Sequence, residues 1–296
     1  MKSTKDIVLP VLAAIGTGKK TIEISELWGG SRALFLFQLF RESKRPLLVV
    51  TANEEEATVL SDDLRFFADT LPGPEGTSSK PEILTFPAWG VLPFEADSPD
   101  SSTVGERMRF LYHLISGTSG IYLAPVASLI QKLMPWDLFA DSVKTISTGQ
   151  QMDPAVLSNA LAASGYEHAA MITRVGEFSR RGGIIDFFSP THDTPIRVEF
   201  FGDTIDSLRA FDLETQRSLG EIKQAVALPV RELIVTDAGI ERFEKQTNIT
   251  TDEHGSDEEQ SKNDIVGQIK LGILPPGSEF LAPFFYDMED LFRYLP

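Results

Sequence analysis

The chain has 296 residues, of which 42% are hydrophobic and 24% are charged, so it can bury a full core and exceeds the usual size of a single domain. It contains no cysteine and only four widely spaced histidines, which argues against disulfides, a zinc site and a cysteine nucleophile. The formal net charge of −16 disfavours direct DNA binding, because affinity for the phosphate backbone comes from concentrated lysine and arginine.

No apolar run approaches the roughly 18 to 20 residues of a membrane span, and the run at 33–40 is followed at once by Arg41, Lys44 and Arg45. The first residues do not resemble a secretory signal peptide. We therefore expect a soluble, cytoplasmic protein with no membrane contact and no bound metal or cofactor.

The first third of the chain predicts strands that alternate with helices. Gly29 and Gly30 open a helix-period segment at 33–40, and Asn53 with Glu56 has the spacing of a helix cap and its reciprocal partner. Short apolar runs predict three buried strands at 47–50, 83–86 and 120–124. A further helix is expected from the spacing of Met108, Phe110, Leu111 and Leu114. Repeated βα units of this kind predict an α/β fold, with a parallel sheet covered by helices on both faces.

The pattern changes near residue 143. Asp153 and Pro154 start a helix that ends at Gly165, and alternating apolar residues then predict strands at 184–188, 196–201 and 205–211. We therefore divide the chain into three segments. They are 1–142, the first part of the α/β domain; 143–230, an inserted small α+β domain; and 231–296, a truncated return to the α/β domain that includes a solvated acidic loop at 251–264.

Residues 16–21 (GTGKKT) are similar to the end of a phosphate-binding loop, but Ala13 takes its first glycine position and Lys20 its hydroxyl position. We interpret them as a surface turn. A working phosphate-binding loop is also followed by a helix whose N-terminal amides face the phosphates. The residues after Lys20 instead alternate as a strand or loop would.

A second loop, Gly29, Gly30, Ser31 and Arg32, precedes the right kind of helix. Ser31, however, stands where a lysine would reach the phosphates, and Arg32 replaces the hydroxyl that binds magnesium. The strand at 120–124 is followed by PVAS, with no carboxylate to hold magnesium. We expect a vestigial nucleotide loop and no catalytic residues.

The inserted domain contains an arginine-rich turn, SRRGG at 179–183, followed by strands that carry Arg197 and Phe201. The simpler interpretation is an ordinary hairpin whose arginines pair with Glu199, Asp203 or Asp206. Arginine together with exposed aromatic residues is also typical of interface centres. Strand alternation places Arg197, Glu199 and Phe201 on one face, and Val198 and Phe200 on the other.

Residues 181–190 (RGGIIDFFSP) and 197–206 (RVEFFGDTID) closely resemble a signature shared by UvrB and bacterial transcription-repair coupling factors, the Mfd family. Residues 85–94 (TFPAWGVLPF), 123–126 (LAPV) and 206–212 (DSLRAFD) match the coupling factors rather than UvrB. In UvrB, the loop that corresponds to 89–102 carries a long aromatic hairpin that clamps damaged DNA. Here that loop is short, and Phe94 is its only aromatic residue after Trp89.

The resemblance implies a helicase-like, P-loop type α/β domain with a degenerate nucleotide site, interrupted by an inserted domain that binds UvrA. The UvrA-contacting positions of the family fall on Arg181, Arg197 and Phe201. It further implies a non-catalytic adaptor that recruits nucleotide excision repair to RNA polymerase stalled at DNA lesions. The resemblance also implies that the full-length family member is an ATP-dependent DNA translocase that displaces the polymerase. Its motor and its polymerase-binding domain lie outside this chain, and another of its domains masks the UvrA surface. The alternative is a UvrB-like nucleotide- or DNA-binding repair subunit.

Overall fold

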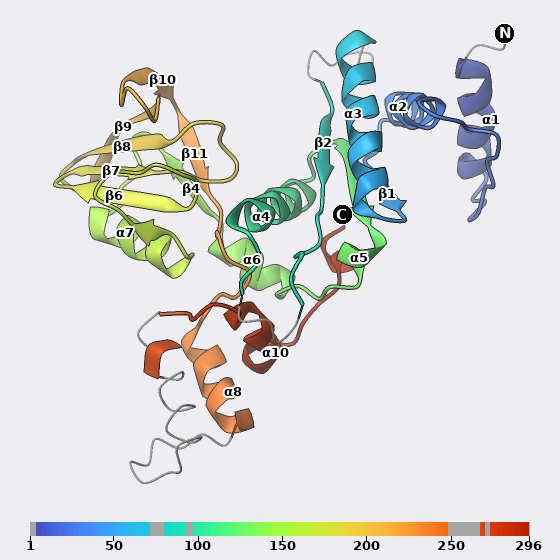
Figure 1. Ribbon diagram of the computed structural model, residues 1–296. Helices are drawn as coiled ribbons and strands as arrows, with labels where there is room; N and C mark the ends of the chain where they lie inside the picture. The colour runs from blue at the N-terminus through green and yellow to red at the C-terminus, as the bar shows by residue number, and fades with distance from the viewer. Residues whose placement is uncertain (1–3, 72–79, 93–96, 248–266, 270–272, 296) are drawn as a thin grey trace. The chain divides into compact units, whose positions relative to one another are not determined.

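The computed structural model describes residues 4–71, 80–92, 97–247, 267–269 and 273–295. The chain forms two compact units (Figure 1). The first unit comprises Met1–Ala88 and His113–Gln131, and the second comprises Trp89–Tyr112 and Lys132–Leu295. No helix in the described part of the chain is both long and apolar enough to cross a membrane. The acidic stretch at 251–264 and Phe94 lie outside the described residues.

The first unit is built on a three-stranded parallel sheet in the order β1-β3-β2. Its strands are β1 (Leu47–Thr51), β2 (Glu82–Thr85) and β3 (Gly120–Pro125). The central strand, β3, is buried at every position, as the sequence predicts. The expectation that residues 47–50 form a buried strand is wrong at Val50, which is half exposed because β1 lies at the edge of the sheet.

Helices α2 and α3 pack on the sheet through one apolar core. The helices of this unit are α1 (Thr4–Gly16), α2 (Ser31–Ser43), α3 (Glu54–Thr70) and α5 (Val126–Leu129). Phe37 of α2 and Leu64 of α3 are fully buried against Ile121 and Leu123 of β3. Helix α1, which carries a proline within it, is not among the elements predicted from the sequence.

The predicted cap of α3 is confirmed. The backbone N–H of Glu56 donates to Asn53 Oδ1 at 2.8 Å. The Glu56 carboxylate returns one residue farther back than expected and accepts the N–H of Ala52 at 2.9 Å. These bonds satisfy two backbone donors next to the helix start and fix where α3 begins after β1.

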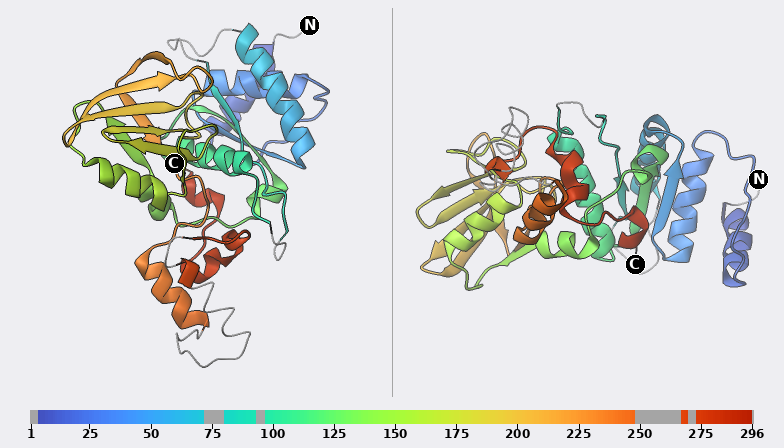
Figure 2. Two further views of the ribbon diagram at one scale, coloured as in Figure 1. Left: turned by 60° about the vertical axis from the view of Figure 1, so that its left-hand side comes forward. Right: turned by 90° about the horizontal axis from the view of Figure 1, so that it is seen from below.

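The second unit contains a six-stranded sheet in the order β10-β9-β8-β7-β6-β5 and a two-stranded antiparallel sheet of β4 and β11 (Figures 1 and 2). All neighbours in the larger sheet are antiparallel except β5 and β6. The strands are β4 (Lys144–Ser147), β5 (Glu167–His168), β6 (Glu177–Arg181), β7 (Ile184–Phe187), β8 (Ile196–Phe201), β9 (Thr204–Phe211), β10 (Ser218–Ile222) and β11 (Gln224–Ala227). The helices are α4 (Ser101–Ile115), most of which belongs to this unit, α6 (Trp136–Ser142), α7 (Pro154–Ala163), α8 (Asp237–Thr247), α10 (Ala282–Phe285) and the 3-10 turns η1 (Ser278–Leu281) and η2 (Leu291–Tyr294).

The six-stranded sheet buries one face against α7. Asp153 caps this helix by accepting the N–H of Ala155 at 2.6 Å, as the sequence predicts. Leu157 and Leu161 of α7 then pack in the same core as Phe187 and Val198 of the sheet. The three strands predicted at 184–188, 196–201 and 205–211 are confirmed as β7, β8 and β9. We call the opposite face of this sheet, which bears Arg181, Asp186, Arg197, Glu199 and Arg209, the outer face.

A buried ionic network joins α4 to residues far along the chain in the second unit. Arg107 is fully buried, and its guanidinium donates to both carboxylate oxygens of Glu232, with Nη2 at 3.1 Å from Oε2. Trp89 Nε1 donates to Glu232 Oε1 at 2.7 Å. A charge that is taken out of water must be paired and hydrogen-bonded. The network therefore fixes α4 to the segment after β11 in one arrangement.

Candidate partner-binding site

A carboxylate at the centre of the outer face holds two arginines. Arg197 forms a bidentate pair with Asp186, with Nε at 2.8 Å from Oδ1 and Nη2 at 2.9 Å from Oδ2. Arg181 Nη2 also donates to Asp186 Oδ2, at 2.8 Å. Asp186 itself is buried. The arginines are thus paired, but with Asp186 and not with Glu199, Asp203 or Asp206, the partners expected for an ordinary hairpin.

Strand register explains why these side chains meet. Asp186 of β7 lies directly opposite Arg197 of β8. Arg181 of β6 lies opposite Ile184, two residues from Asp186 on the same face, and is therefore its diagonal neighbour. Long side chains bridge both direct and diagonal positions in antiparallel sheets. Two of the three residues predicted as partner contacts, Arg181 and Arg197, are therefore brought together.

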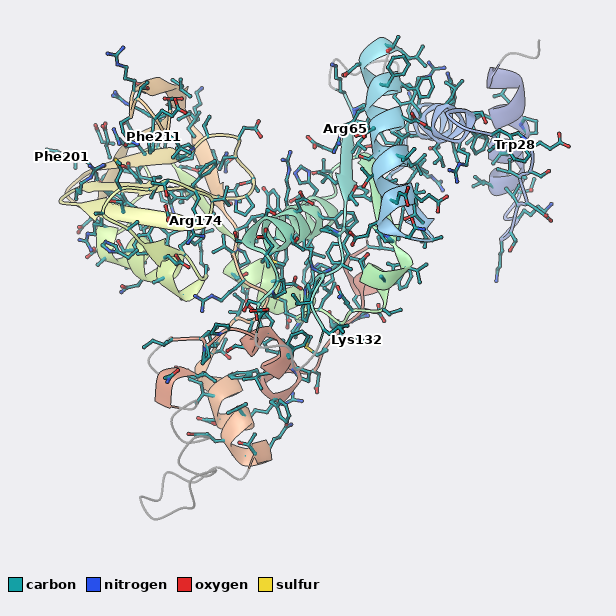
Figure 3. The ribbon with its side chains drawn as sticks, viewed as in Figure 1. Trp28, Arg65, Lys132, Arg174, Phe201 and Phe211 are labelled. Carbon is teal, nitrogen blue, oxygen red and sulfur yellow. The ribbon has the colours of Figure 1, made fainter. Side chains whose placement is uncertain are left out.

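The third predicted contact, Phe201, lies at the end of β8 and is 83% exposed. Figure 3 shows its side chain projecting from the tip of the six-stranded sheet, away from the ribbon. The predicted alternation is confirmed, because Val198 is buried and Phe200 packs against the core below the sheet. Glu199 lies between Arg197 and Phe201 on the outer side and accepts a hydrogen bond from Ser207 at 2.6 Å. One continuous patch of Arg181, Arg197 and Phe201 remains a prediction.

The two arginines differ in how much of each side chain a partner can reach. Arg181 is 54% exposed, whereas Arg197 is 21% exposed. The guanidinium of Arg197 lies over the ring of Phe211, 4.6 Å from its centroid, and its hydrogen bonds with Asp186 raise its pKa. Arg197 therefore stabilises the fold through Asp186 and Phe211 and is also a candidate interface residue.

Asp186 is not among the site residues predicted from the sequence, although its position in the sequence carries a signal. Asp186 interrupts the apolar run IIDFF, at a position that a strand places on the same side as its arginine neighbours. A lone carboxylate within a strand core is unfavourable unless a cation pairs with it. An aspartate flanked by arginines on both adjacent strands is thus a recognisable pattern once the strand register is known.

The loop at Gly29, Gly30, Ser31 and Arg32 lies at the start of α2, with Gly30 at the cap position. Arg32 is ion-paired with Glu56 of α3. Hydrogen bonds from Ala52 and Arg32 lower the pKa of Glu56, so its carboxylate is charged. A Cβ built on Gly30 would lie 3.7 Å from Oδ2 of Asp63. Arg32 is therefore already neutralised within the unit, and the Asp63 carboxylate near Gly30 opposes a phosphate at this position.

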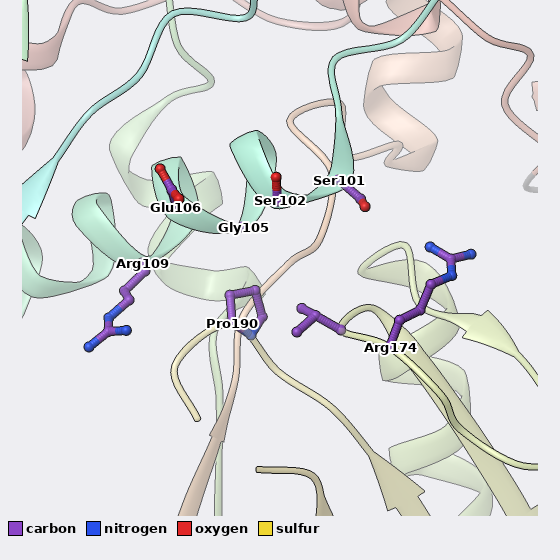
Figure 4. A pocket seen from close by; sticks show the side chains of 8 residues that line it. Ser101, Ser102, Gly105, Glu106, Arg109, Arg174 and Pro190 are labelled. Atoms are coloured by element: carbon purple, nitrogen blue, oxygen red, sulfur yellow. The ribbon is translucent and has the colours of Figure 1, made fainter. Parts of the chain in front are cut away.

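A pocket of about 360 Å³ lies beside the N-terminal half of α4, lined by Arg109, Arg174 and Pro190 among others (Figure 4). Arg174 is ion-paired with Glu167 and Glu177. Glu106 adds a further carboxylate to the lining. Over the described residues, no group of three histidine, aspartate or glutamate side chains is arranged to hold a metal ion. The lining thus carries charged side chains of both signs.

Proteins of known description match about nine tenths of the chain. A family model described as the UvrB interaction domain matches residues 145–233. The chain is 34% identical to a transcription-repair-coupling factor of Myxococcus xanthus over 272 residues, which cover 91% of this chain and 22% of that protein. Similar proteins of the same description occur in Haemophilus influenzae, 33% identical over 90% of the chain, and in Escherichia coli K12, 28% identical over 92%.

The chain spans about a fifth of the length of these curated relatives. The matched region of the family model contains β5 to β11 together with Arg181, Asp186 and Arg197. The chain is therefore homologous to the transcription-repair-coupling factors over about nine tenths of its length, and it carries a UvrB interaction domain.

Proposed function

We propose that this chain is a non-catalytic adaptor module that binds UvrA through the outer face of the six-stranded sheet. It would so recruit nucleotide excision repair to RNA polymerase stalled at DNA lesions. The observation that carries the proposal is the position of Arg181 and Phe201. Both are exposed, and both lie within the residues that match the UvrB interaction domain. Exposed arginine and aromatic side chains are the residue types that most often anchor protein interfaces.

The chemistry of the outer face supports an acidic partner surface. Arg181 uses Nη2 for Asp186 and is otherwise half exposed, so its fork can still meet a carboxylate of a partner. Asp186 limits the rotamers of Arg181 before binding, which reduces the entropy lost on association. Phe201 supplies apolar area that a partner pocket can bury.

Binding of purified UvrA to this chain, measured by calorimetry, tests the proposal. We expect saturable binding at micromolar concentrations or below, weakening as salt is raised because arginine and carboxylate groups contribute. Failure to bind UvrA at low salt would contradict the proposed function. Saturable binding to duplex DNA in its place would support the alternative, a DNA-binding repair subunit, which the net charge of −16 opposes.

We further propose that the first unit, which carries the parallel sheet, is a helicase-like domain with a degenerate nucleotide site. Ser31 and Arg32 occupy the positions of the phosphate-binding lysine and the magnesium-binding hydroxyl. Arg32 is also engaged by Glu56, and Asp63 lies close to Gly30. We also propose that the chain divides into segments 1–142, 143–230 and 231–296. The second segment is inserted into the α/β domain that the first and third form.

We expect no tight ATP binding and no measurable ATP hydrolysis by this chain. The Asp63 carboxylate near Gly30 repels the phosphates, Arg32 is already paired with Glu56, and the loop offers no lysine to bind them. Titration with ATP and magnesium in a calorimeter, alongside a phosphate-release assay, measures both. Micromolar affinity for ATP would contradict the expectation and favour the UvrB-like nucleotide-binding alternative.

The activity of the whole protein is proposed from its relatives. The longer protein would be an ATP-dependent DNA translocase that displaces the polymerase, with its motor and its contacts to polymerase and DNA outside these residues. Another domain of the same protein would mask the outer face until the motor engages DNA. Exposure of Arg181 and Phe201 here is consistent with such a surface left uncovered.

A further inference from the structure

Charged side chains form a row across the outer face, one from each of four adjacent strands. The register places Asp186 opposite Arg197, Arg197 opposite Arg209, and Arg209 opposite Glu221. Directly opposite residues on antiparallel strands have Cβ atoms about 5 Å apart. Two guanidinium groups are therefore neighbours at the centre of the row. Like charges in such positions destabilise a sheet, so each arginine needs an anion nearby.

The two central arginines are neutralised unequally. Arg197 has the bidentate pair with Asp186 and the ring of Phe211. Arg209 Nη2, in contrast, lies 3.8 Å from Glu199 Oε2 and 3.6 Å from Glu221 Oε1. Both distances exceed those of a hydrogen bond.

The guanidinium of Arg209 also has unused hydrogen-bonding capacity. Its Nε is buried, yet no acceptor in the described part of the chain lies within hydrogen-bond distance of it. The side chain as a whole is 38% exposed, so its outer nitrogens can be reached from solvent. Ion pairs this long and this exposed contribute little to stability. The position of Arg209 is thus poorly explained by folding alone.

We propose that Arg209 is a further contact residue of the outer face and binds a carboxylate side chain of the partner. The inference rests on the proposed UvrA-binding function and extends it to a residue on β9, two strands from Asp186. A planar guanidinium with unused N–H donors recognises a carboxylate through two parallel hydrogen bonds. A partner carboxylate would also give Arg209 the hydrogen-bonded anion that Glu199 and Glu221, at 3.8 and 3.6 Å, do not provide. Strands lie about 4.8 Å apart, so the row fits within one interface of ordinary size.

The test compares UvrA binding by the parent chain, Arg209→Ala, Arg209→Gln and the control Arg180→Ala. Arg180 is an exposed arginine next to Arg181, but it lies opposite the core residue Ile185 and so on the other face of the sheet. We expect Arg209→Ala and Arg209→Gln to weaken binding about tenfold or more. The dependence of affinity on salt should become shallower, since one interfacial charge is lost. Arg180→Ala should bind like the parent, and none of the variants should shift the thermal midpoint by more than about 2 °C.

The outcomes separate this inference from the function on which it rests. If Phe201→Ala loses binding but both Arg209 variants bind within about twofold of the parent, the inference is wrong and the proposed function stands. If the parent does not bind UvrA, the proposed function fails and the inference fails with it. Equal losses for the Arg180 and Arg209 variants would show a general effect of charge and overturn the role of Arg209. If Arg209→Ala is destabilised, Arg209→Gln, which keeps the Cβ and Cγ methylenes and an N–H donor but removes the charge, decides the outcome.

Discussion

Replacing Phe201 with alanine is expected to weaken UvrA binding about thirtyfold or more, which corresponds to about 2 kcal/mol. The ring is 83% exposed, so truncation removes interface area and leaves no cavity in the folded chain. The thermal midpoint should consequently stay at the parent value. Calorimetric binding and a thermal melt of the same preparation measure the two effects separately.

The matched control for this variant is Phe66→Ala, because Phe66 is also an exposed phenylalanine but lies on α3 in the first unit. It should bind UvrA like the parent. Arg181→Ala should behave as Phe201→Ala does, with weaker binding and an unchanged melt, since Arg181 is half exposed. If both Arg181→Ala and Phe201→Ala bind with parental affinity, the interface lies elsewhere on the molecule.

Arg197→Ala should act differently from these two. It removes the bidentate partner of the buried Asp186 and the cation above Phe211. A buried carboxylate left without its partner costs about 2 kcal/mol or more, so the thermal midpoint should fall by roughly 5 °C. Reduced UvrA binding by this variant alone would therefore not identify a direct contact. Binding must be measured well below the midpoint.

The largest loss of stability is expected for Arg107→Ala. The substitution leaves the buried carboxylate of Glu232 without the guanidinium that donates to both of its oxygens, although Trp89 Nε1 still donates to it. Removing one member of a buried ion pair costs about 3 to 5 kcal/mol, which corresponds to roughly 10 °C in the thermal midpoint. Urea unfolding followed by tryptophan fluorescence provides the measurement, and Trp89 lies within the network itself.

The surface ion pair of Arg242 and Asp287 is the control for Arg107. Asp287 is exposed, and the pair is a single contact of 2.7 Å. Arg242→Ala should therefore unfold close to the parent. Replacing Arg107 and Glu232 together with methionine should recover part of the stability that Arg107→Ala loses, because no buried charge is then left unpaired. An unfolding midpoint of Arg107→Ala equal to that of the parent would show that the network does not hold the unit together.

Local patterns in the sequence determined where several helices begin and which faces of the strands are buried. Asn53 followed by Glu56 fixes the start of α3, and Asp153 before a proline fixes the start of α7. Both depend on contacts within four residues, which sequence spacing reports directly. Strand alternation likewise placed Val198 in the core and Phe201 outside it, because successive side chains of a strand point to opposite faces. The candidate interface residues Arg181, Arg197 and Phe201 came from the family signature.

Tertiary structure decided which of these residues share contacts. Asp186 pairs with both arginines because of strand register, which depends on how neighbouring strands align and not on any one strand's sequence. Register likewise set Arg209 opposite Arg197, and strand order exposed Val50 at a sheet edge. Arg107 and Glu232 are 125 residues apart in the chain, so no local pattern predicts their contact. Propensity and alternation act over a few residues, whereas burial and ion pairing arise when distant segments pack, and only the folded chain determines them.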